Sequence, residues 1–276
     1  MSLTVNTNLS AMGAANALNR TQGQLSLTLT RVSSGLRVTR AADDAAGSAV
    51  ATNLSTQARS GRQAVRNAND GVSVIQTAES ATKEVLNILD RMRELAVQSS
   101  SDTLENGERA YIDAEFHQLS DEIERIAQSS EFNDLALADG STTTLDVQVG
   151  IDASSNSRVS ISLGNLTTSN LTVQTTDVDL TASSGAQDAI TTIDAAIDSV
   201  NSIRADYGAV QNRLDSSIRN MTTYVESLSA AASQIMDADY AHETSEMTRL
   251  QVMQQAGVAA LSQAKGINQS VISLLG

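Results

Sequence analysis

The amino-acid sequence predicts a mainly α protein: a long helical coiled-coil bundle with a small β-hairpin region and terminal helices that pair on assembly. Apolar residues recur at alternating spacings of three and four along most of the chain, which is the pattern of one helical face. The 276 residues contain no proline, so long helices meet no residue that lacks a backbone donor. Only 2% of the residues are aromatic, and Ala, Leu, Ile and Val supply most of the apolar content, which suits thin helical packing.

The amino-terminal segment carries a narrow stripe of small apolar residues at seven-residue spacing. Gly13 and Gly23 lie in the same segment, and each costs up to about 1 kcal/mol relative to Ala in a helix interior. We therefore expect this end to be disordered in the free chain and to fold only against the other end and against neighbouring subunits. The stripe consists of Ala11, Leu18, Leu25 and Val32.

Two further helices follow, separated by the polar breakers Ser-Ser-Ser-Asp and Glu-Asn-Gly. The first of them is apolar on two faces, so more than one neighbour covers it. Three such helices can cover each other as a bundle. The first helix presents Ile75, Ala78, Thr82, Val85, Leu89, Met92 and Ala96 on one face and Leu86, Ile88 and Leu95 on the other, and the second presents Ile112, Phe116, Leu119, Ile123 and Ile126.

Between residues 135 and 184 the apolar pattern changes from helical to alternating. Two alternating runs predict short strands, and the turn-rich segment 152–157 between them predicts a hairpin. The high Ser and Thr content leaves too little apolar material for an independent core, so we expect a small β-hairpin insertion at about 140–184 on a helical rod. The first run is Leu145, Val147, Val149 and Ile151, and the second is Val159, Ile161 and Leu163.

The clearest heptad pattern begins at Ile190 and predicts one long helix. If residues 190–235 are continuous, this helix is on the order of 70 Å long. Arg204 and Gln211 interrupt one of its two apolar series, and polar residues at such positions usually set register. The uninterrupted series is Ile193, Val200, Tyr207, Leu214, Met221, Leu228 and Ile235.

The carboxy-terminal segment again carries a narrow, small-residue stripe. Gly257 and Gly266 weaken it as a helix, so we expect it to be disordered in the free chain as well. A protease should therefore shorten both ends of the monomer. The stripe consists of Leu250, Met253, Gly257, Ala260, Ala264, Ile267, Val271 and Leu274.

Composition excludes several classes of function. With no cysteine and two histidines, the chain lacks the ligands of common zinc sites and cannot form a disulfide. His242-Glu243 begins like a zinc-protease helix motif, but no second histidine follows at the fifth position. We therefore expect ordinary helix surface there, no catalytic residue, no metal and no cofactor.

Charge and hydropathy limit the partners. Nucleic-acid binding is disfavoured by the net charge of −14 and by the absence of aromatic residues from the Arg-rich first 66 residues. Pairing of this segment with acidic helices of the same assembly is the simpler interpretation. No segment predicts a membrane span or a cleaved signal peptide. Assembly driven partly by these charges should depend on ionic strength.

Several short stretches at both ends of the chain resemble bacterial flagellins. The amino-terminal stretches cover about the first 130 residues, and the carboxy-terminal ones close the chain. Val38-Thr39-Arg40 and Lys265-Gly266-Ile267-Asn268 depart from the family pattern, which affects details of subunit contact. The matching stretches are Val5-Asn6-Thr7-Asn8, Ser33–Arg37, Asp43–Gly47, Asn67–Gly71, Arg93–Gln98, Asp237–Ala241, Gln254–Gly257 and Leu274-Leu275-Gly276.

The resemblance implies a structural subunit that polymerises with copies of itself into the flagellar filament and serves swimming motility. It implies an inner coiled-coil domain of residues 1–40 and 237–276, and a helical bundle domain of residues 41–236 without the large outer domains of longer flagellins. Subunits are expected to contact each other through Leu18, Leu25, Val32, Leu250, Met253, Ala260, Ile267, Val271 and Leu274.

The resemblance also implies partners and a location. These are hook-associated junction and cap proteins, a cytoplasmic export chaperone on the carboxy-terminal helix, and export to the outside of the cell without a cleaved signal peptide. By position, Arg91, Leu95 and Glu115 correspond to a patch that a flagellin-sensing Toll-like receptor recognises, and axial subunit packing is the simpler role for it.

Two other functions fit part of the sequence. A hook–filament junction adaptor has similar ends but joins filaments instead of extending them, and it is the closer alternative. A chemoreceptor-like signalling hairpin also has long Ala/Ser/Gln-rich heptads. Such receptors usually carry membrane spans and fold back at a tight tip, whereas this chain has a β-rich insertion midway.

Overall fold

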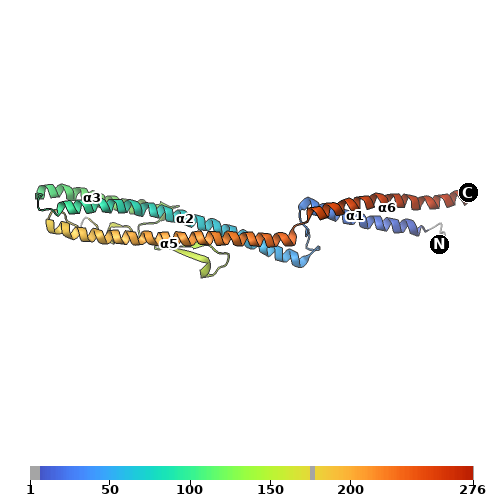
Figure 1. Cartoon of the computed structure of the whole chain (residues 1–276), viewed down its shortest axis with the longest axis horizontal. Helices are drawn as coiled ribbons and strands as arrows, with labels where there is room; N and C mark the ends of the chain where they lie inside the picture. Colours follow the sequence, from blue (N-terminus) through green and yellow to red (C-terminus); the bar gives the residue numbers. More distant parts are fainter. Residues whose placement is uncertain (1–6, 175–177, 276) are drawn as a thin grey trace. The chain divides into compact units, whose positions relative to one another are not determined.

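The protein is built from long helices with two small strand pairs (Figure 1). The computed structural model describes the backbone of residues 7–174 and 178–275 and, within these ranges, the side chains up to residue 266. Two compact units divide the chain: a terminal unit, Met1–Thr56 with Ser227–Gly276, and a bundle unit, Gln57–Glu226. These divisions fall inside long helices that continue without a break.

Three helices form the bundle, as their apolar spacing predicted. They are α2 (Ala45–Ser99), α3 (Asn106–Ser129) and α5 (Ser183–Met236). The three helices share one core of fully buried side chains. It contains Val85, Leu89 and Met92 of α2, Phe116 and Ile123 of α3, and Ile193 and Val200 of α5. At Gly61 a Cβ would lie 2.5 Å from the Val225 side chain, so glycine permits the close approach of α2 and α5.

The two faces of α2 are both buried in part. The heptad residues Ile75, Leu89 and Ala96 are fully buried, and Leu95 of the second face is 1% exposed. On α5 the uninterrupted heptad series is buried from Ile193 to Leu214, whereas the series containing Arg204 and Gln211 is only half-buried from Ile190 to Ile218. The polar interruptions thus lie at the bundle margin and not in its centre.

The predicted hairpin is present. Strands β3 (Thr144–Gln148) and β4 (Arg158–Ser162) pair antiparallel, with Val147 opposite Val159 and Leu145 opposite Ile161. Val147, Val159 and Ile161 face a second cluster with Ile75 and Tyr207, so the helices supply the core that the hairpin lacks.

A shorter strand pair precedes the hairpin and was not predicted. Strands β1 (Glu131–Phe132) and β2 (Leu135–Ala136) are joined by Asn133 and Asp134, whose φ angles are 50° and 63°. Two consecutive residues in the left-handed region are typical of a tight hairpin turn, and Asn and Asp tolerate this conformation best among residues other than glycine.

The segment after the hairpin contains the short helix α4 (Thr168–Leu171) and runs back over the bundle. Its apolar side chains are buried in the bundle core, and buried serines fix its backbone. Ser120 Oγ donates to the Val173 carbonyl at 2.8 Å, and Ser99 Oγ donates to the Leu180 carbonyl at 2.6 Å. The apolar contacts are those of Leu166, Leu171, Val173, Val178 and Leu180.

Helices α1 (Leu9–Ser34) and α6 (Tyr240–Leu275) lie side by side in the terminal unit and form what we call the terminal pair (Figure 1). Helix α1 ends at Gly35, whose φ of 71° places it in the left-handed region that favours glycine. Helix α1 begins at the cap Asn8, whose side chain accepts a hydrogen bond from the Ala11 amide at 2.9 Å.

Candidate self-assembly interface

The inner face of the terminal pair buries part of each predicted terminal stripe. On α1, Leu25 is buried and Leu18 and Val32 are half-buried, and on α6 Leu250 is 1% exposed. A Cβ at Gly257 would lie 3.3 Å from Leu18 Cδ1, so the small residue lets the two helices approach closely. The stripes therefore meet within one chain.

Polar contacts fix the register of the terminal pair. The Asn8 side-chain amide donates to the Ala264 carbonyl at 2.9 Å. Arg31 lies 3.5 Å from Glu243, whose side chain is buried, and charged partners in such a position must pair because a lone buried charge is costly. The Tyr240 hydroxyl donates to the Val32 carbonyl.

The same geometry explains the partial metalloprotease motif. Glu243 faces Arg31, while His242 is exposed on α6. Within the described residues no group of three or more His, Asp or Glu side chains is placed to hold a metal ion. His242 therefore lies on the helix surface, and Glu243 belongs to a partly buried ion pair.

Sequence reasoning missed several residues of this inner face. Thr21 and Thr28 are buried on α1, and Gln254 and Leu261 are half-buried on α6. Thr21 and Thr28 follow the same seven-residue spacing as Leu18 and Leu25, which is the signal that would have identified them. The hydroxyl of Thr21 donates to the Ala17 carbonyl at 3.0 Å, so threonine can be buried there.

The outer face of the terminal pair is also apolar in part. Met253 is 44% exposed and Ala260 is exposed, so these two predicted contact residues point away from α1. The predicted contact residues Ile267, Val271 and Leu274 lie outside the described side chains. Other large apolar side chains exposed on these helices are Leu9, Met12, Leu29, Tyr240, Val252 and Val258.

The loop after α1 is tied to the end of α5. Arg37 donates from its amide to the Met236 carbonyl at 2.6 Å and from Nη2 to the Ile235 carbonyl at 2.7 Å. Asp43 accepts hydrogen bonds from the Thr39 hydroxyl and from the amides of Thr39 and Arg40, and these bonds lower the pKa of its carboxyl group. Thr39, one of the departures from the family pattern, is thus part of a local turn.

The predicted patch on α2 and α3 combines surface charges with a buried residue. Arg91 donates to Glu115 Oε1 at 2.8 Å and to Glu94 Oε2 at 2.9 Å, and these contacts, that with Glu115 first, raise the pKa of the guanidinium group. Leu95 points into the bundle core and is 1% exposed. Arg91 and Glu115 are therefore the accessible part of the patch, and Leu95 supports them from beneath.

Comparison with known proteins identifies the two halves of this architecture. The bacterial flagellin N-terminal helical region matches residues 5–143, and the bacterial flagellin C-terminal helical region matches residues 190–275. A flagellin of Halalkalibacterium halodurans is 42% identical over 273 residues, which cover 98% of this chain and 99% of that protein. The chain belongs to the bacterial flagellin family.

Other flagellins show how the length of this member compares. The flagellar filament 33 kDa core protein of Treponema phagedenis is 38% identical over 283 residues, covering 98% of this chain and 99% of its own. Flagellin A of Vibrio anguillarum is 32% identical over 380 residues, covering all of both chains. With 276 residues, this chain is a short form of flagellin.

Membership of the family establishes the role of the chain. It is a structural subunit of the flagellar filament and not an enzyme, and it polymerises with other flagellin copies outside the cell. Neither the relatives nor the family regions favour the junction adaptor. No helix in the described ranges is long and apolar enough to cross a membrane.

Proposed function

We propose that the outer face of the terminal pair is the surface through which copies of this chain polymerise. The observation that supports it is the set of exposed apolar side chains on α6, among them Met253 and Val258. Burying apolar surface stabilises association by about 25 cal/mol per Å² before the costs of ordering the partners are subtracted. Ala260, Ile267, Val271 and Leu274 extend the proposed contact along α6.

In this proposal Leu18, Leu25, Val32 and Leu250 act indirectly. They join α1 to α6, and the paired helices then present the outer face to neighbours. Residues 1–40 and 237–276 would form the inner domain of the filament, and residues 41–236 would form the bundle domain. A free chain whose ends are unpaired would lack the contact surface, so pairing and polymerisation would be coupled.

Seeded elongation tests the proposal. Val258→Asn should slow the growth of filament fragments strongly, since it puts an amide into a contact that excludes water. Val50→Asn is the matched control, because Val50 is 50% exposed, Val258 is 53% exposed, and Val50 lies outside the terminal pair. Light scattering and electron microscopy follow growth, and circular dichroism confirms equal helix content. Equal growth of both variants and the native chain would refute the proposed contact.

The remaining expected partners would use the same surfaces. An export chaperone would cover the outer face of α6 before secretion, and hook-associated junction and cap proteins would meet it at the filament ends. Arg91 and Glu115 would serve axial packing and, in a host, recognition by a flagellin-sensing Toll-like receptor. Arg91→Ala should weaken receptor activation by soluble monomer, whereas Arg125→Ala, at another exposed pair on α3, should not.

We further propose export through the flagellar secretion channel without removal of a leader. The narrow, small-residue helices at the chain ends suit passage in an unfolded state. Mass spectrometry of the protein in filaments tests this directly, since an intact amino terminus is expected and a shortened one would contradict it.

A further inference from the structure

The turn between α2 and α3 leads into an asparagine–glycine pair. Asn106 and Gly107 are the first two residues of α3, both are exposed, and the sequence contains no other Asn-Gly pair. Glycine has no side chain to hinder approach to its backbone nitrogen, and a Cβ built at Gly107 would meet nothing within 4 Å. The Gly107 nitrogen is therefore open to the Asn106 side chain that precedes it.

The Gly107 amide is not engaged in a hydrogen bond. The first four N–H groups of a helix have no carbonyl partner within the helix. At the start of α3 the Glu108 and Arg109 amides both donate to the Glu105 carbonyl, at 3.0 and 3.1 Å. Within the described residues the Gly107 amide has no acceptor. Its nitrogen is therefore available as a nucleophile once a base from the solvent removes the proton.

Arg109 donates to the side-chain carbonyl of Asn106. Its Nη1 lies 3.3 Å from Asn106 Oδ1. Backbone carbonyls hold the guanidinium in place, since Nε donates to Ser99 at 3.0 Å and Nη2 donates to Ser101 at 2.9 Å, and Arg109 is 7% exposed. A fixed donor on a carbonyl oxygen stabilises the negative charge that develops there when a nucleophile attacks the carbon. Arg109 is thus placed to assist attack on Asn106 Cγ.

We propose that Asn106 is a site of spontaneous deamidation, at which the side-chain amide converts to a carboxylate in the folded chain. The Gly107 nitrogen bonds to Asn106 Cγ, the bond from Cγ to the side-chain nitrogen breaks, and ammonia leaves. Water then opens the cyclic imide, so that one water is consumed and one ammonia is released for each asparagine converted. The modification adds one negative charge at the start of α3 and is independent of the polymerisation contact proposed above.

The position of Arg109 also determines which product forms. Water that attacks Cγ gives aspartate with an unchanged backbone, whereas water that attacks the backbone carbonyl gives isoaspartate, whose main chain is longer by one carbon. Because Arg109 donates to the oxygen on Cγ, it polarises this carbonyl, and aspartate is the expected main product in the folded chain. The new carboxylate lies at the amino end of a helix and beside a guanidinium, and both interactions stabilise it.

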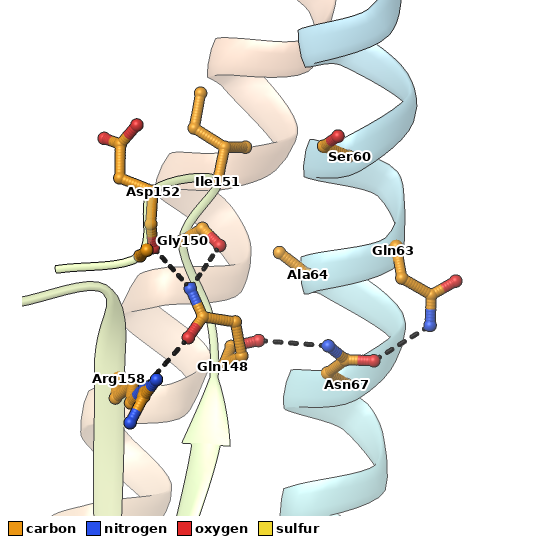
Figure 2. Close-up of a pocket in the computed structure, with 10 residues that line it drawn as sticks. Ser60, Gln63, Ala64, Asn67, Gln148, Gly150, Ile151, Asp152 and Arg158 are labelled. Atoms are coloured by element: carbon orange, nitrogen blue, oxygen red, sulfur yellow. Dashed lines mark hydrogen bonds between the residues drawn. The ribbon is translucent and has the colours of Figure 1, made fainter. Parts of the chain in front are cut away.

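The loop between β3 and β4 contains an asparagine–serine pair that supplies an internal comparison. This loop and α2 enclose a groove of about 410 Å³, and Arg158 lies exposed at its edge (Figure 2). Gln148 Nε2 fixes the loop by donating to two of its carbonyls at 2.9 and 2.7 Å (Figure 2). Asn156 is exposed, but the Ser157 amide that follows it donates to the Ser154 carbonyl at 3.1 Å. Its nucleophilic nitrogen is therefore engaged, unlike that of Gly107.

Peptide mapping by mass spectrometry tests the site. Filaments of the full chain are incubated at pH 8 and sampled over weeks. Asn106 should convert about tenfold faster than Asn156, because at Asn156 a hydrogen bond must break before attack. Gly107→Ser gives both sites the same dipeptide and should preserve this order of rates. An Asn106 that stays unconverted would overturn the proposal, and so would equal rates at the two sites in the Gly107→Ser variant.

The ratio of aspartate to isoaspartate tests the contribution of Arg109. Aspartate should exceed isoaspartate in the full chain, and the ratio should reverse in the tryptic peptide 94–109, which has the same residues without the fold. An enzyme that methylates isoaspartate measures the ratio in both. The same ratio in chain and peptide would show that Arg109 does not direct the opening of the ring.

Asn106→Asp tests the stability of the product separately from the reaction. It should raise the melting temperature by about 1 to 3 °C in the native chain, and by less in an Arg109→Met background. Circular dichroism checks that the variants have equal helix content. A melting temperature that Asn106→Asp leaves unchanged or lowers would refute the stabilising contact, and so would an equal gain in both backgrounds.

Discussion

The hydroxyl of Tyr207 accounts for one testable part of the stability of the bundle unit. Tyr207 is 2% exposed on α5, and its hydroxyl oxygen accepts a hydrogen bond from the Gly164 amide at 3.0 Å. Tyr207→Phe keeps the ring in the cluster beneath the hairpin and removes only this acceptor. The Gly164 amide then loses its acceptor next to packed side chains. Leaving one partner of a hydrogen bond unsatisfied costs more than removing both partners.

The expected loss is about 1 to 2 kcal/mol in the free energy of unfolding, the cost of leaving a partly buried donor unsatisfied. For a unit of this size, each 1 kcal/mol lowers the melting temperature by about 2 to 4 °C. Calorimetry measures the shift, and hydrogen exchange at the Gly164 amide locates it. Tyr224→Phe is the matched control, because Tyr224 is on the same helix and 40% exposed, and it should change neither quantity.

The pH dependence supplies a second readout with a defined sign. Burial raises the pKa of Tyr207, against a smaller lowering by the hydrogen bond from Gly164. Above the unfolded value of about 10, the unfolded chain releases the phenol proton while the folded chain retains it. Ionisation of Tyr207 in the unfolded chain therefore lowers the stability of the native protein as the pH rises past 10, by at most about 1.4 kcal/mol per pH unit, and Tyr207→Phe lacks this contribution.

The difference between the native protein and Tyr207→Phe should consequently shrink above pH 10. Two results would refute the reasoning. One is a melting temperature unchanged by Tyr207→Phe at neutral pH, which would show that the hydrogen bond contributes nothing. The other is a stability difference that stays constant from pH 8 to pH 11, which would show that the phenol is not shielded in the folded state.

Three further substitutions test the helix contacts. Leu250→Ala should destabilise the pairing of α1 and α6 by about 2 to 4 kcal/mol, measured by amide exchange in α1, while Met253→Ala at the exposed face should leave that pairing unchanged. Arg109→Met should lower the free energy of unfolding by about 3 kcal/mol in denaturant titrations. The reason is that the Arg109 guanidinium donates to the Ser99 and Ser101 carbonyls at 3.0 and 2.9 Å at the end of α2. Arg125→Met, on the exposed side of α3, is the control and should cause no measurable loss. Gly35→Ala should shift the melting temperature down by the equivalent of about 1 kcal/mol, since its φ is 71°, and an unchanged melting temperature would contradict this.

The spacing of apolar residues was sufficient to predict the bundle, because residues at helical spacing lie on one side of a helix and that side packs against the neighbouring helices. Ile193, Val200 and Leu214 are spaced at multiples of seven residues, and a helix places residues at that spacing on one side, where they are fully buried. The hairpin followed in the same way from the alternation of Val147 with polar neighbours. The pair β1–β2 gave no such signal, since its strands have two residues each and depend on the left-handed conformation of Asn133 and Asp134.

The sequence does not specify how the two terminal helices face each other. The sequence predicts apolar stripes on both terminal helices, but a narrow stripe of alanines and glycines does not specify which side faces the partner helix. Leu250 lies on the inner face and Met253 on the outer face, although they are three residues apart. The packing of α1 decides this, through the close approach of Leu18 to Gly257 and the bond from Asn8 to Ala264.

The sequence alone determined the helical class, the hairpin and the family, because spacing, proline content and short motifs are properties of the chain itself. Which charged residues have their hydrogen bonds satisfied within the chain, and which remain exposed to a partner, depends on the folded structure. Arg109 and Arg158 both have polar neighbours in the sequence. In the structure, however, Arg109 is buried and donates to backbone carbonyls, whereas Arg158 lies exposed at a groove. That difference depends on chain segments far away in sequence, since folding determines which groups replace water around each charge.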